Sequence, residues 1–233
     1  MATAAEMAAI INDSKNIVFL TGAGVSTASG IPDYRSMEGI YTTSGLKEPE
    51  YLLSRQAMLY DTDNFYRFIR QLYQTEAQPN IIHQKITELA EKKNVTVITQ
   101  NIDGLHRRTQ RLDVIEFHGT LAECHCENCF APLSFETFLQ GYRHESCGGI
   151  IRPDVVLYDE QIDYANISRS INALKKADTI AVIGTSFRVY PFAGLVSEAS
   201  PSAKILTINK ETLDIPTVFA SYVGDAAAVF EKL

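Results

Sequence analysis

The chain has 233 residues, of which 45% are hydrophobic and 21% are charged. This length can bury one sizeable core and a small appended module. The formal net charge of −7 argues against nonspecific nucleic-acid binding and against an anionic membrane surface, because both need a basic field. The sequence also has neither a signal-peptide pattern nor a run of roughly 20 apolar residues. We therefore expect a cytoplasmic protein with no membrane partner and no direct nucleic-acid partner.

Short β-branched runs alternate with helical patterns along the chain. Residues 3–13 place Ala, Met and Ile at helical spacing, and the first strand is predicted at Ile17–Thr21. The further predicted strands are Val95–Thr99, Val114–Phe117, Thr179–Ile183 and Lys204–Ile208, and the further predicted helices are His83–Lys92 and Ile167–Lys176. This alternation predicts an α/β fold, a parallel sheet with helices on both faces.

Two stretches interrupt the alternation. Residues 36–79 are rich in Tyr and Phe, which favours a helical insertion that forms a lobe or lid. Residues 121–149 carry all four cysteines and little regular pattern. Cysteines this close together in sequence cannot form a disulfide framework for the whole fold. Local metal ligation in a reducing compartment produces such a cluster.

A glycine-rich loop, Gly22–Gly30, directly follows the first strand. Glycines at this place let backbone N–H groups approach a pyrophosphate. Thr27 stands where the usual dinucleotide fingerprint has its third glycine, and no acidic residue ends a second strand about 20 positions on, which weakens the interpretation as an ordinary dehydrogenase. A tight strand-to-helix turn without any ligand is the alternative.

Polar residues also follow the next two predicted strands. The segment Thr99–His106 gathers short polar side chains at the carboxyl end of a strand, where ligands collect in open α/β sheets, although a capped turn would look the same. His118 follows Val114–Phe117 and has the ordinary pKa that suits a general base, but a lone histidine is more often a surface or core residue.

The cysteine-rich stretch offers three ligands of a zinc site. Cys126 and Cys129 form a C-x2-C pair, and Cys147 follows 18 residues later. The fourth ligand is either His144, which has the better spacing, or Cys124. A module that binds no zinc is the third possibility, with thiols that are buried or labile to oxidation.

The whole segment Gly22–Arg35 resembles the signature of the sirtuin family, with Tyr34 where that family usually has phenylalanine. Gln100–Asp103, Phe117–Gly119 and the cysteine module follow in the order typical of sirtuins. The resemblance implies an NAD-dependent protein lysine deacylase that releases nicotinamide, free lysine and O-acyl-ADP-ribose. Its partners would be acylated-lysine proteins, and its zinc would be structural.

The resemblance also implies a domain division and a set of roles. Residues 1–35, 80–120 and 150–233 would form a Rossmann-like NAD-binding domain, and residues 36–79 and 121–149 would form a small lobe. His118 would be the catalytic base, Asn101 would orient ribose or water, and Val155 with Val156 would contact the substrate. The implied NAD-binding residues are Gly22, Ala23, Gly24, Ser26, Thr27, Asp33, Tyr34, Arg35, Gln100, Ile102, Asp103, Gly184, Thr185, Ser186, Asn209 and Asp225.

The acyl preference follows from two positions in the Tyr- and Phe-rich insertion. Sirtuins that favour acidic acyl groups carry a tyrosine and an arginine there, and the corresponding residues of this chain are Phe65 and Phe68, while Tyr66 and Arg70 lie nearby. We therefore expect an apolar tunnel for acetyl or longer fatty acyl groups. A protein mono-ADP-ribosyltransferase and an inactive NAD-binding scaffold are the alternative functions.

Overall fold

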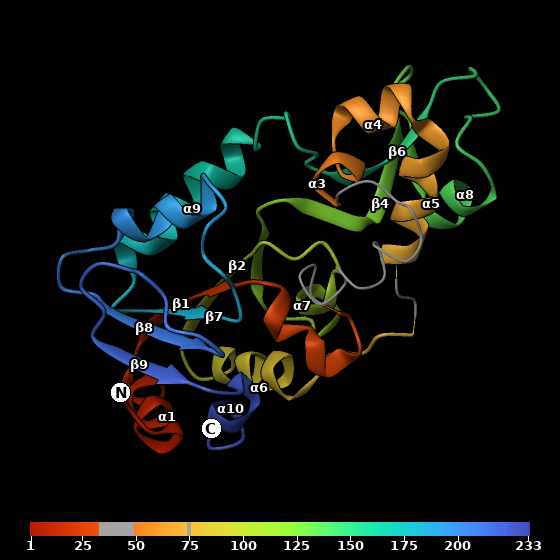
Figure 1. The fold of residues 1–233 in the computed structure, drawn as a ribbon. Helices are drawn as coiled ribbons and strands as arrows, with labels where there is room; N and C mark the ends of the chain where they lie inside the picture. The colour runs from red at the N-terminus through yellow and green to blue at the C-terminus, as the bar shows by residue number, and fades with distance from the viewer. Residues whose placement is uncertain (33–48, 74–75) are drawn as a thin grey trace.

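Six parallel strands form the larger sheet of the computed structural model, which describes residues 1–32, 49–73 and 76–233 (Figure 1). The strand order is β3-β2-β1-β7-β8-β9, and every adjacent pair is parallel. The strand bounds are β1 Asn16–Thr21, β2 Asn94–Thr99, β3 Asp113–Glu116, β7 Thr179–Ile183, β8 Lys204–Asn209 and β9 Ala220–Val223. The predicted parallel α/β sheet is confirmed.

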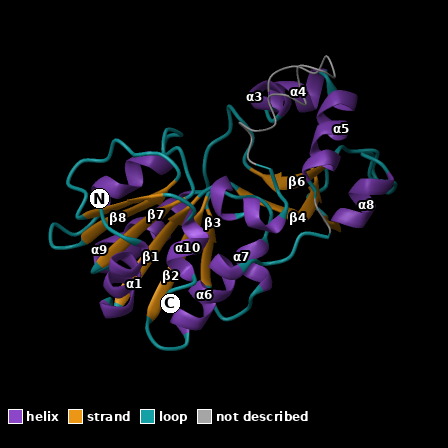
Figure 2. Cartoon of the chain, turned by 60° about the horizontal axis from the view of Figure 1, so that its bottom comes forward, coloured by secondary structure: helices purple, strands orange, loops and turns teal. Residues whose placement is uncertain are grey.

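Both faces of this sheet are covered by helices, as Figure 2 shows. Side chains of β1 alternate between two cores: Ile17 and Phe19 pack on one face, and Val18 and Leu20 pack on the other. One face carries α1 (Ala4–Asp13), α6 (Ile81–Ala90) and α10 (Ala226–Phe230), and the other carries α9 (Tyr164–Lys176) and the 3-10 helix η3 (Phe192–Glu198). Burial on both faces explains why the strands read as continuous apolar runs rather than as alternating ones.

A second, three-stranded sheet lies beside the first, with the antiparallel order β5-β4-β6 (Figure 2). It packs with the described part of the Tyr- and Phe-rich insertion around a third apolar core, which includes Phe65, Leu121, Phe138 and Leu157. The bounds of these elements are α3 Pro49–Leu52, α4 Arg55–Tyr60, α5 Thr62–Leu72, β4 Gly119–Cys126, β5 Pro132–Ser134, α8 Phe135–Gln140 and β6 Ile151–Val155.

The three helices predicted from periodicity are present, with boundaries shifted by a few residues. Capping residues set where they begin: Thr3 and Glu6 form a capping box at α1, and Asn80 and His83 form one at α6. The glycine loop continues into two 3-10 turns, η1 (Ala23–Val25) and η2 (Thr27–Ser29). Among the described helices, none is long and apolar enough to cross a bilayer.

Candidate active site

A cavity of about 830 Å³ opens at the carboxyl ends of β1, β2 and β7, beside the strand β6 of the small sheet. The chain leaves β1 towards β2 on one side and reaches β7 on the other, so the cavity lies at the point where the strand order reverses and where open α/β sheets bind ligands. The residues expected from the sequence that line it are Gly22, Ala23, Gly24, Thr27, Gln100, Asn101, Ile102, His118, Val155, Val156, Gly184, Thr185, Ser186, Asn209 and Asp225. Asp33, Tyr34 and Arg35 lie outside the described residues.

Two loops interlock at the base of the cavity. The Gly24 N–H donates to the Gly184 carbonyl over 2.7 Å, and a Cβ atom on Gly24 would stand 2.7 Å from the Gly184 Cα. Gly184 itself has a φ of +58°, a conformation that side chains rarely adopt. The packing of the β1 loop on the β7 loop therefore requires these glycines, whether or not a ligand binds. A tight turn without a ligand, the alternative that the sequence left open, accounts for part of their role.

Ser26 and Asp103 lie beneath the cavity wall in a hydrogen-bonded network. The Ser26 hydroxyl donates to the Asp103 carboxylate over 2.6 Å. The Asn101 side-chain amide donates to the Ser26 Oγ over 3.0 Å and to the Gly22 carbonyl over 3.1 Å. Ser26 is only 1% exposed, so the centre of this network is shielded from water and fixes the two loops relative to each other.

Gln100 connects the β2 loop to the β7 loop. Its side-chain amide donates to the Thr185 Oγ1 over 2.7 Å, and the same oxygen accepts from the Phe187 N–H. Further along the cavity, the Asn209 carbonyl accepts from the Gly224 N–H, and Asp225 caps the start of α10. The carboxyl ends of all six strands of the larger sheet, and the loops that follow them, thus contribute residues to one cavity.

His118 is half-buried and has a defined tautomer. Its Nδ1 lies 3.3 Å from the Gln100 carbonyl oxygen, which can only accept, so Nδ1 carries the proton and Nε2 keeps a lone pair. Burial lowers the pKa of His118, although the hydrogen bond to Gln100 opposes that shift. A neutral imidazole with a free Nε2 on the cavity wall is suited to accept a proton at neutral pH.

Two further histidines lie in the core. His83 and His106 are 0% and 2% exposed, and their ring centroids are 4.5 Å apart. His83 accepts the Asn80 N–H at the start of α6, and His106 contacts the Thr21 hydroxyl at 3.2 Å. Burial lowers the pKa of both imidazoles, so they stay neutral and serve packing.

Part of the cavity wall is apolar. Leu53, Ile102, Val156 and Leu157 line it. The Val156 N–H donates to the His118 carbonyl over 2.9 Å, which joins this wall to the histidine that follows β3. We define Val155–Leu157 as the strip.

Phe65 and Phe68 are fully buried in the core of the insertion rather than at the cavity surface. Phe65 shares a core cluster with Ile102, Val155 and Leu157, so it backs the apolar wall. The Tyr66 hydroxyl donates to the Ile151 carbonyl, and an Arg70 guanidinium N–H donates to the Phe138 carbonyl. Neither side chain lines the cavity.

The candidate metal centre consists of Cys126, Cys129, His144 and Cys147, whose ligand atoms lie within 4.8 Å of one another. The Cys126 and Cys147 sulfurs are 3.4 Å apart, and the His144 Nδ1 is 3.3 Å from the Cys129 sulfur. Ligands of a tetrahedral zinc ion stand roughly 3.5–4 Å apart, because Zn–S and Zn–N bonds are about 2.0–2.3 Å long. A Cβ atom on Gly149 would stand 2.6 Å from the Cys126 sulfur, so this glycine leaves the space that the cluster needs.

Cys124 lies apart from this cluster. The residue is 2% exposed and packs in the third core, where burial raises the pKa of its thiol to about 12. A thiol that stays protonated in an apolar core is a poor metal ligand. The geometry therefore selects His144 over Cys124 as the fourth ligand.

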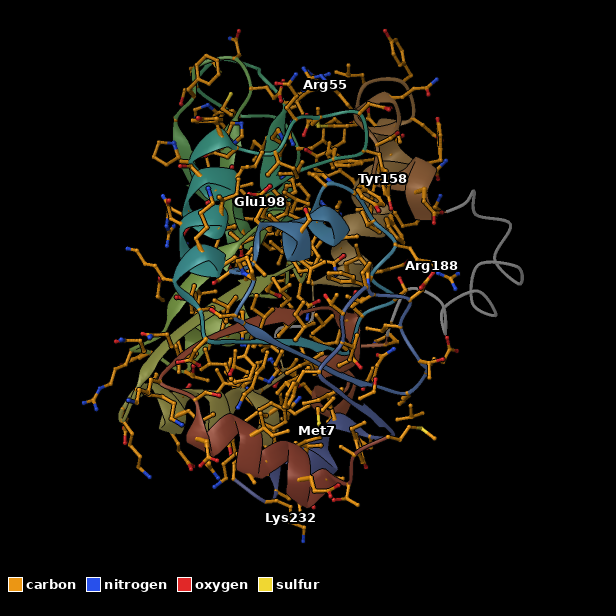
Figure 3. The ribbon with its side chains drawn as sticks, turned by 90° about the vertical axis from the view of Figure 1, so that its left-hand side faces the viewer. Met7, Arg55, Tyr158, Arg188, Glu198 and Lys232 are labelled. Atoms are coloured by element: carbon orange, nitrogen blue, oxygen red, sulfur yellow. The ribbon has the colours of Figure 1, made fainter. Side chains whose placement is uncertain are left out.

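Sequence reasoning missed several cavity residues. Tyr158 and Arg188, labelled in Figure 3, both line the cavity, as do Leu53 and Tyr190. Arg188 and Tyr190 follow Thr185 and Ser186 in the loop after β7, so their place after a strand was an available signal. Leu53 comes from the insertion, and no motif marked it.

Comparisons with known proteins find relatives over nearly the whole chain. The model of the Sir2 family matches residues 22–191. The NAD-dependent protein deacetylase of Listeria monocytogenes serovar 1/2a is 45% identical over 224 residues, which cover 96% of this chain and 97% of the relative. That of Enterococcus faecalis is 43% identical over 231 residues, which cover 99% and 97%.

Solved structures show the same fold. A Sir2 homolog–NAD complex is 32% identical, with a TM-score of 0.86 over 97% of this chain and 91% of the solved chain. A Sir2 structure with a deacetylated p53 peptide and 3′-O-acetyl ADP ribose is 30% identical, with a TM-score of 0.88 over 99% and 97%. With its motifs in order along one chain and a family match that spans most of its length, the protein belongs to the Sir2, or sirtuin, family.

Proposed function

We propose that this chain is an NAD-dependent protein lysine deacylase that prefers acetyl or other apolar acyl groups. The observation that carries the proposal is the position of His118 in the cavity. The imidazole lies between the polar loops that follow β1, β2 and β7 and the apolar strip. A base placed there can reach both a nucleotide ribose and an acyl group.

The polar half of the cavity fits NAD. Gly22, Ala23, Gly24 and Thr27 offer a close backbone approach for the diphosphate, and Gln100, Thr185 and Asn209 offer polar side chains for the riboses. Ser26 and Asp103 hold the nicotinamide end of this surface in shape, and Ile102 lines it. Asp33, Tyr34 and Arg35 complete the proposed set on sequence grounds. Bound NAD supplies the ribose carbon that takes the acyl oxygen, with nicotinamide as the leaving group.

His118 and Asn101 carry the proposed proton chemistry. The lone pair on the His118 Nε2 accepts a proton from a ribose hydroxyl, while the Gln100 carbonyl holds the ring in the required tautomer. Asn101 keeps one amide N–H on Ser26 and one on Gly22, which aligns its side chain at the cavity wall to orient ribose or water.

Acylated-lysine proteins are the proposed substrates. Leu53, Val156 and Leu157 exclude water from the acyl chain, and the strip offers backbone groups beside them for an extended peptide. The solved Sir2 structures with a deacetylated peptide and with a propionylated peptide support this substrate class. The apolar wall supports acetyl and longer apolar groups over acidic ones.

Zinc is the proposed occupant of the Cys126, Cys129, His144 and Cys147 cluster, and its role there is structural. The cluster closes on itself with four protein ligands and leaves no position for substrate. We propose that it organises a small lobe formed by residues 36–79 and 121–149, beside an NAD-binding domain formed by residues 1–35, 80–120 and 150–233.

The decisive experiment incubates the protein with an acetyl-lysine peptide and NAD. We expect equimolar nicotinamide and deacetylated peptide, and a loss of activity of at least about 100-fold in His118→Ala, with NAD binding retained by calorimetry. Radiolabel from NAD that passes to protein without acyl loss would instead indicate a mono-ADP-ribosyltransferase. NAD binding without turnover would indicate a scaffold.

A further inference from the structure

Four alternating charges meet where the small sheet, the insertion and the strip converge. We call Arg55, Glu127, Arg152 and Glu160 the charge joint. Arg55 begins α4, Glu127 lies in the turn between Cys126 and Cys129, Arg152 belongs to β6, and Glu160 follows the strip. Each member thus comes from a different segment.

Every basic member of the joint contacts both acidic members. The Arg55 guanidinium lies 3.2 Å from the Glu127 carboxylate and 3.1 Å from the Glu160 carboxylate. The Arg152 guanidinium lies 3.0 Å from Glu127 and 2.6 Å from Glu160. The side chain of Arg152 is 7% exposed and that of Arg55 is 42% exposed, so the joint runs from the interior to the surface.

Two members of the charge joint form hydrogen bonds with the backbone of the strip. An Arg152 guanidinium N–H donates to the Val155 carbonyl over 2.7 Å, and the Glu160 carboxylate accepts the Leu157 N–H over 3.0 Å. Between these two contacts, the Val156 N–H donates to the His118 carbonyl over 2.9 Å. The charges therefore hold both ends of a three-residue segment whose middle is attached to the proposed catalytic base.

We propose that Glu127 and Arg55 are positioning residues for the acyl-lysine substrate. Through their ion pairs with Arg152 and Glu160, they fix the position of the strip relative to the metal module and α4. The strip is the segment that we propose to receive the peptide. Neither side chain lines the cavity. This inference rests on the proposed function, because it assigns the strip to peptide binding.

If the four charges only stabilised the fold, their loss would have a different effect on the kinetics. A partly buried ion pair often adds little net stability, because desolvation of the charges offsets their attraction. Its directional hydrogen bonds nevertheless fix geometry. Loss of a positioning contact should therefore raise the KM for the peptide selectively, whereas general loosening would lower the melting temperature and affect NAD and peptide alike.

The test uses Glu127→Gln, which keeps the side-chain shape and removes the charge. We expect the peptide KM, and the peptide Kd from fluorescence anisotropy, to rise by about fivefold or more, with the NAD KM and the zinc content changed less than about twofold. Glu88→Gln is the matched control, since it breaks the exposed Lys85–Glu88 pair on α6 and should leave every parameter unchanged.

Arg55→Gln provides a second variant at a more exposed position and carries the test if Glu127→Gln does not fold. We expect the same selective rise in peptide KM, an effect in the double variant smaller than the sum of the singles, and partial rescue by Arg55→Lys. An unchanged peptide KM, or equal changes for peptide and NAD, would overturn the proposal.

The design separates this inference from the proposed function. Wild-type turnover is measured in parallel, so an inactive wild type would refute the deacylase assignment itself. Peptide binding measured by anisotropy does not need turnover. Weak binding by Glu127→Gln, compared with tight binding by Glu88→Gln, supports the positioning role of Glu127 whether or not the wild type is active.

Discussion

Ser26 donates a 2.6 Å hydrogen bond to Asp103 from a position that is only 1% exposed. The same hydroxyl oxygen accepts a hydrogen bond from the Asn101 side-chain amide, so the Ser26 hydroxyl bonds to two partners. Replacement by alanine leaves a partly buried carboxylate oxygen and a buried amide N–H without this partner.

We predict that Ser26→Ala lowers the free energy of unfolding by about 1–3 kcal/mol, the usual cost of a buried polar group that loses its partner. The NAD KM should rise more than the peptide KM, because the network supports the loops that we propose to bind NAD. Urea unfolding and steady-state kinetics test this, with exposed Ser197→Ala as control. Equal effects of the two substitutions would contradict the prediction.

The pH dependence of activity follows from His118. Burial lowers the pKa of this imidazole below its ordinary value of 6.5, against the opposing hydrogen bond to Gln100. The proposed base works only when neutral, so activity is present above the lowered pKa and falls as the pH drops through it. We predict an acid limb of kcat/KM below pH 6.5. A profile measured with saturating NAD tests this, and a limb above that pH argues for another base.

Metal content distinguishes the two candidate fourth ligands. His144→Ala removes a group 3.3 Å from the Cys129 sulfur, so we expect loss of zinc and a lower melting temperature. Cys124→Ala changes a thiol buried in the third core and should retain one equivalent of zinc. Elemental analysis of both purified proteins provides the measurement. Zinc retained by His144→Ala and lost by Cys124→Ala would reverse the ligand choice.

Stability at acid pH reflects Glu160. Burial alone would raise its pKa, but hydrogen bonds from Arg152 and from the Leu157 N–H lower the pKa to about 2. A carboxyl whose folded pKa is depressed stabilises the fold above its unfolded pKa of about 4.5, and this contribution disappears as the pH falls towards 2. We predict that Glu160→Gln is less stable than wild type at pH 6. Denaturant midpoints should converge as the pH is lowered from 4.5, and a constant difference would refute the prediction.

The central strands were predictable because both of their faces are buried. Residues 17–21, 95–99 and 179–183 are continuous apolar or β-branched runs, and the structure places them side by side. The edge strand β9 was not predicted, since its four residues, Ala220–Val223, are only partly buried and carry no such run. The three-stranded sheet was also missed, because its register depends on partners far apart in sequence, such as Cys126 and Ile151.

The site was predictable where its residues belong to contiguous motifs. Gln100, Asn101 and His118 follow strands that end at one edge of the sheet, and the fold brings them into one cavity. The choice between His144 and Cys124 required the fold, because spacing alone does not tell which thiol enters a core. The charge joint gave no sequence signal, since Arg55 and Glu160 are 105 residues apart.

The close packing of Gly24 on Gly184 requires glycine at both positions in any related sequence that folds in this way. Neither position has room for a methyl group, whether or not a nucleotide is ever bound. A descendant that abandoned catalysis would keep both glycines for as long as it folded in this way, while His118 could drift once its chemistry was no longer selected. The glycine pair is therefore a marker of inherited architecture, and the histidine is a marker of the base chemistry that we propose for it.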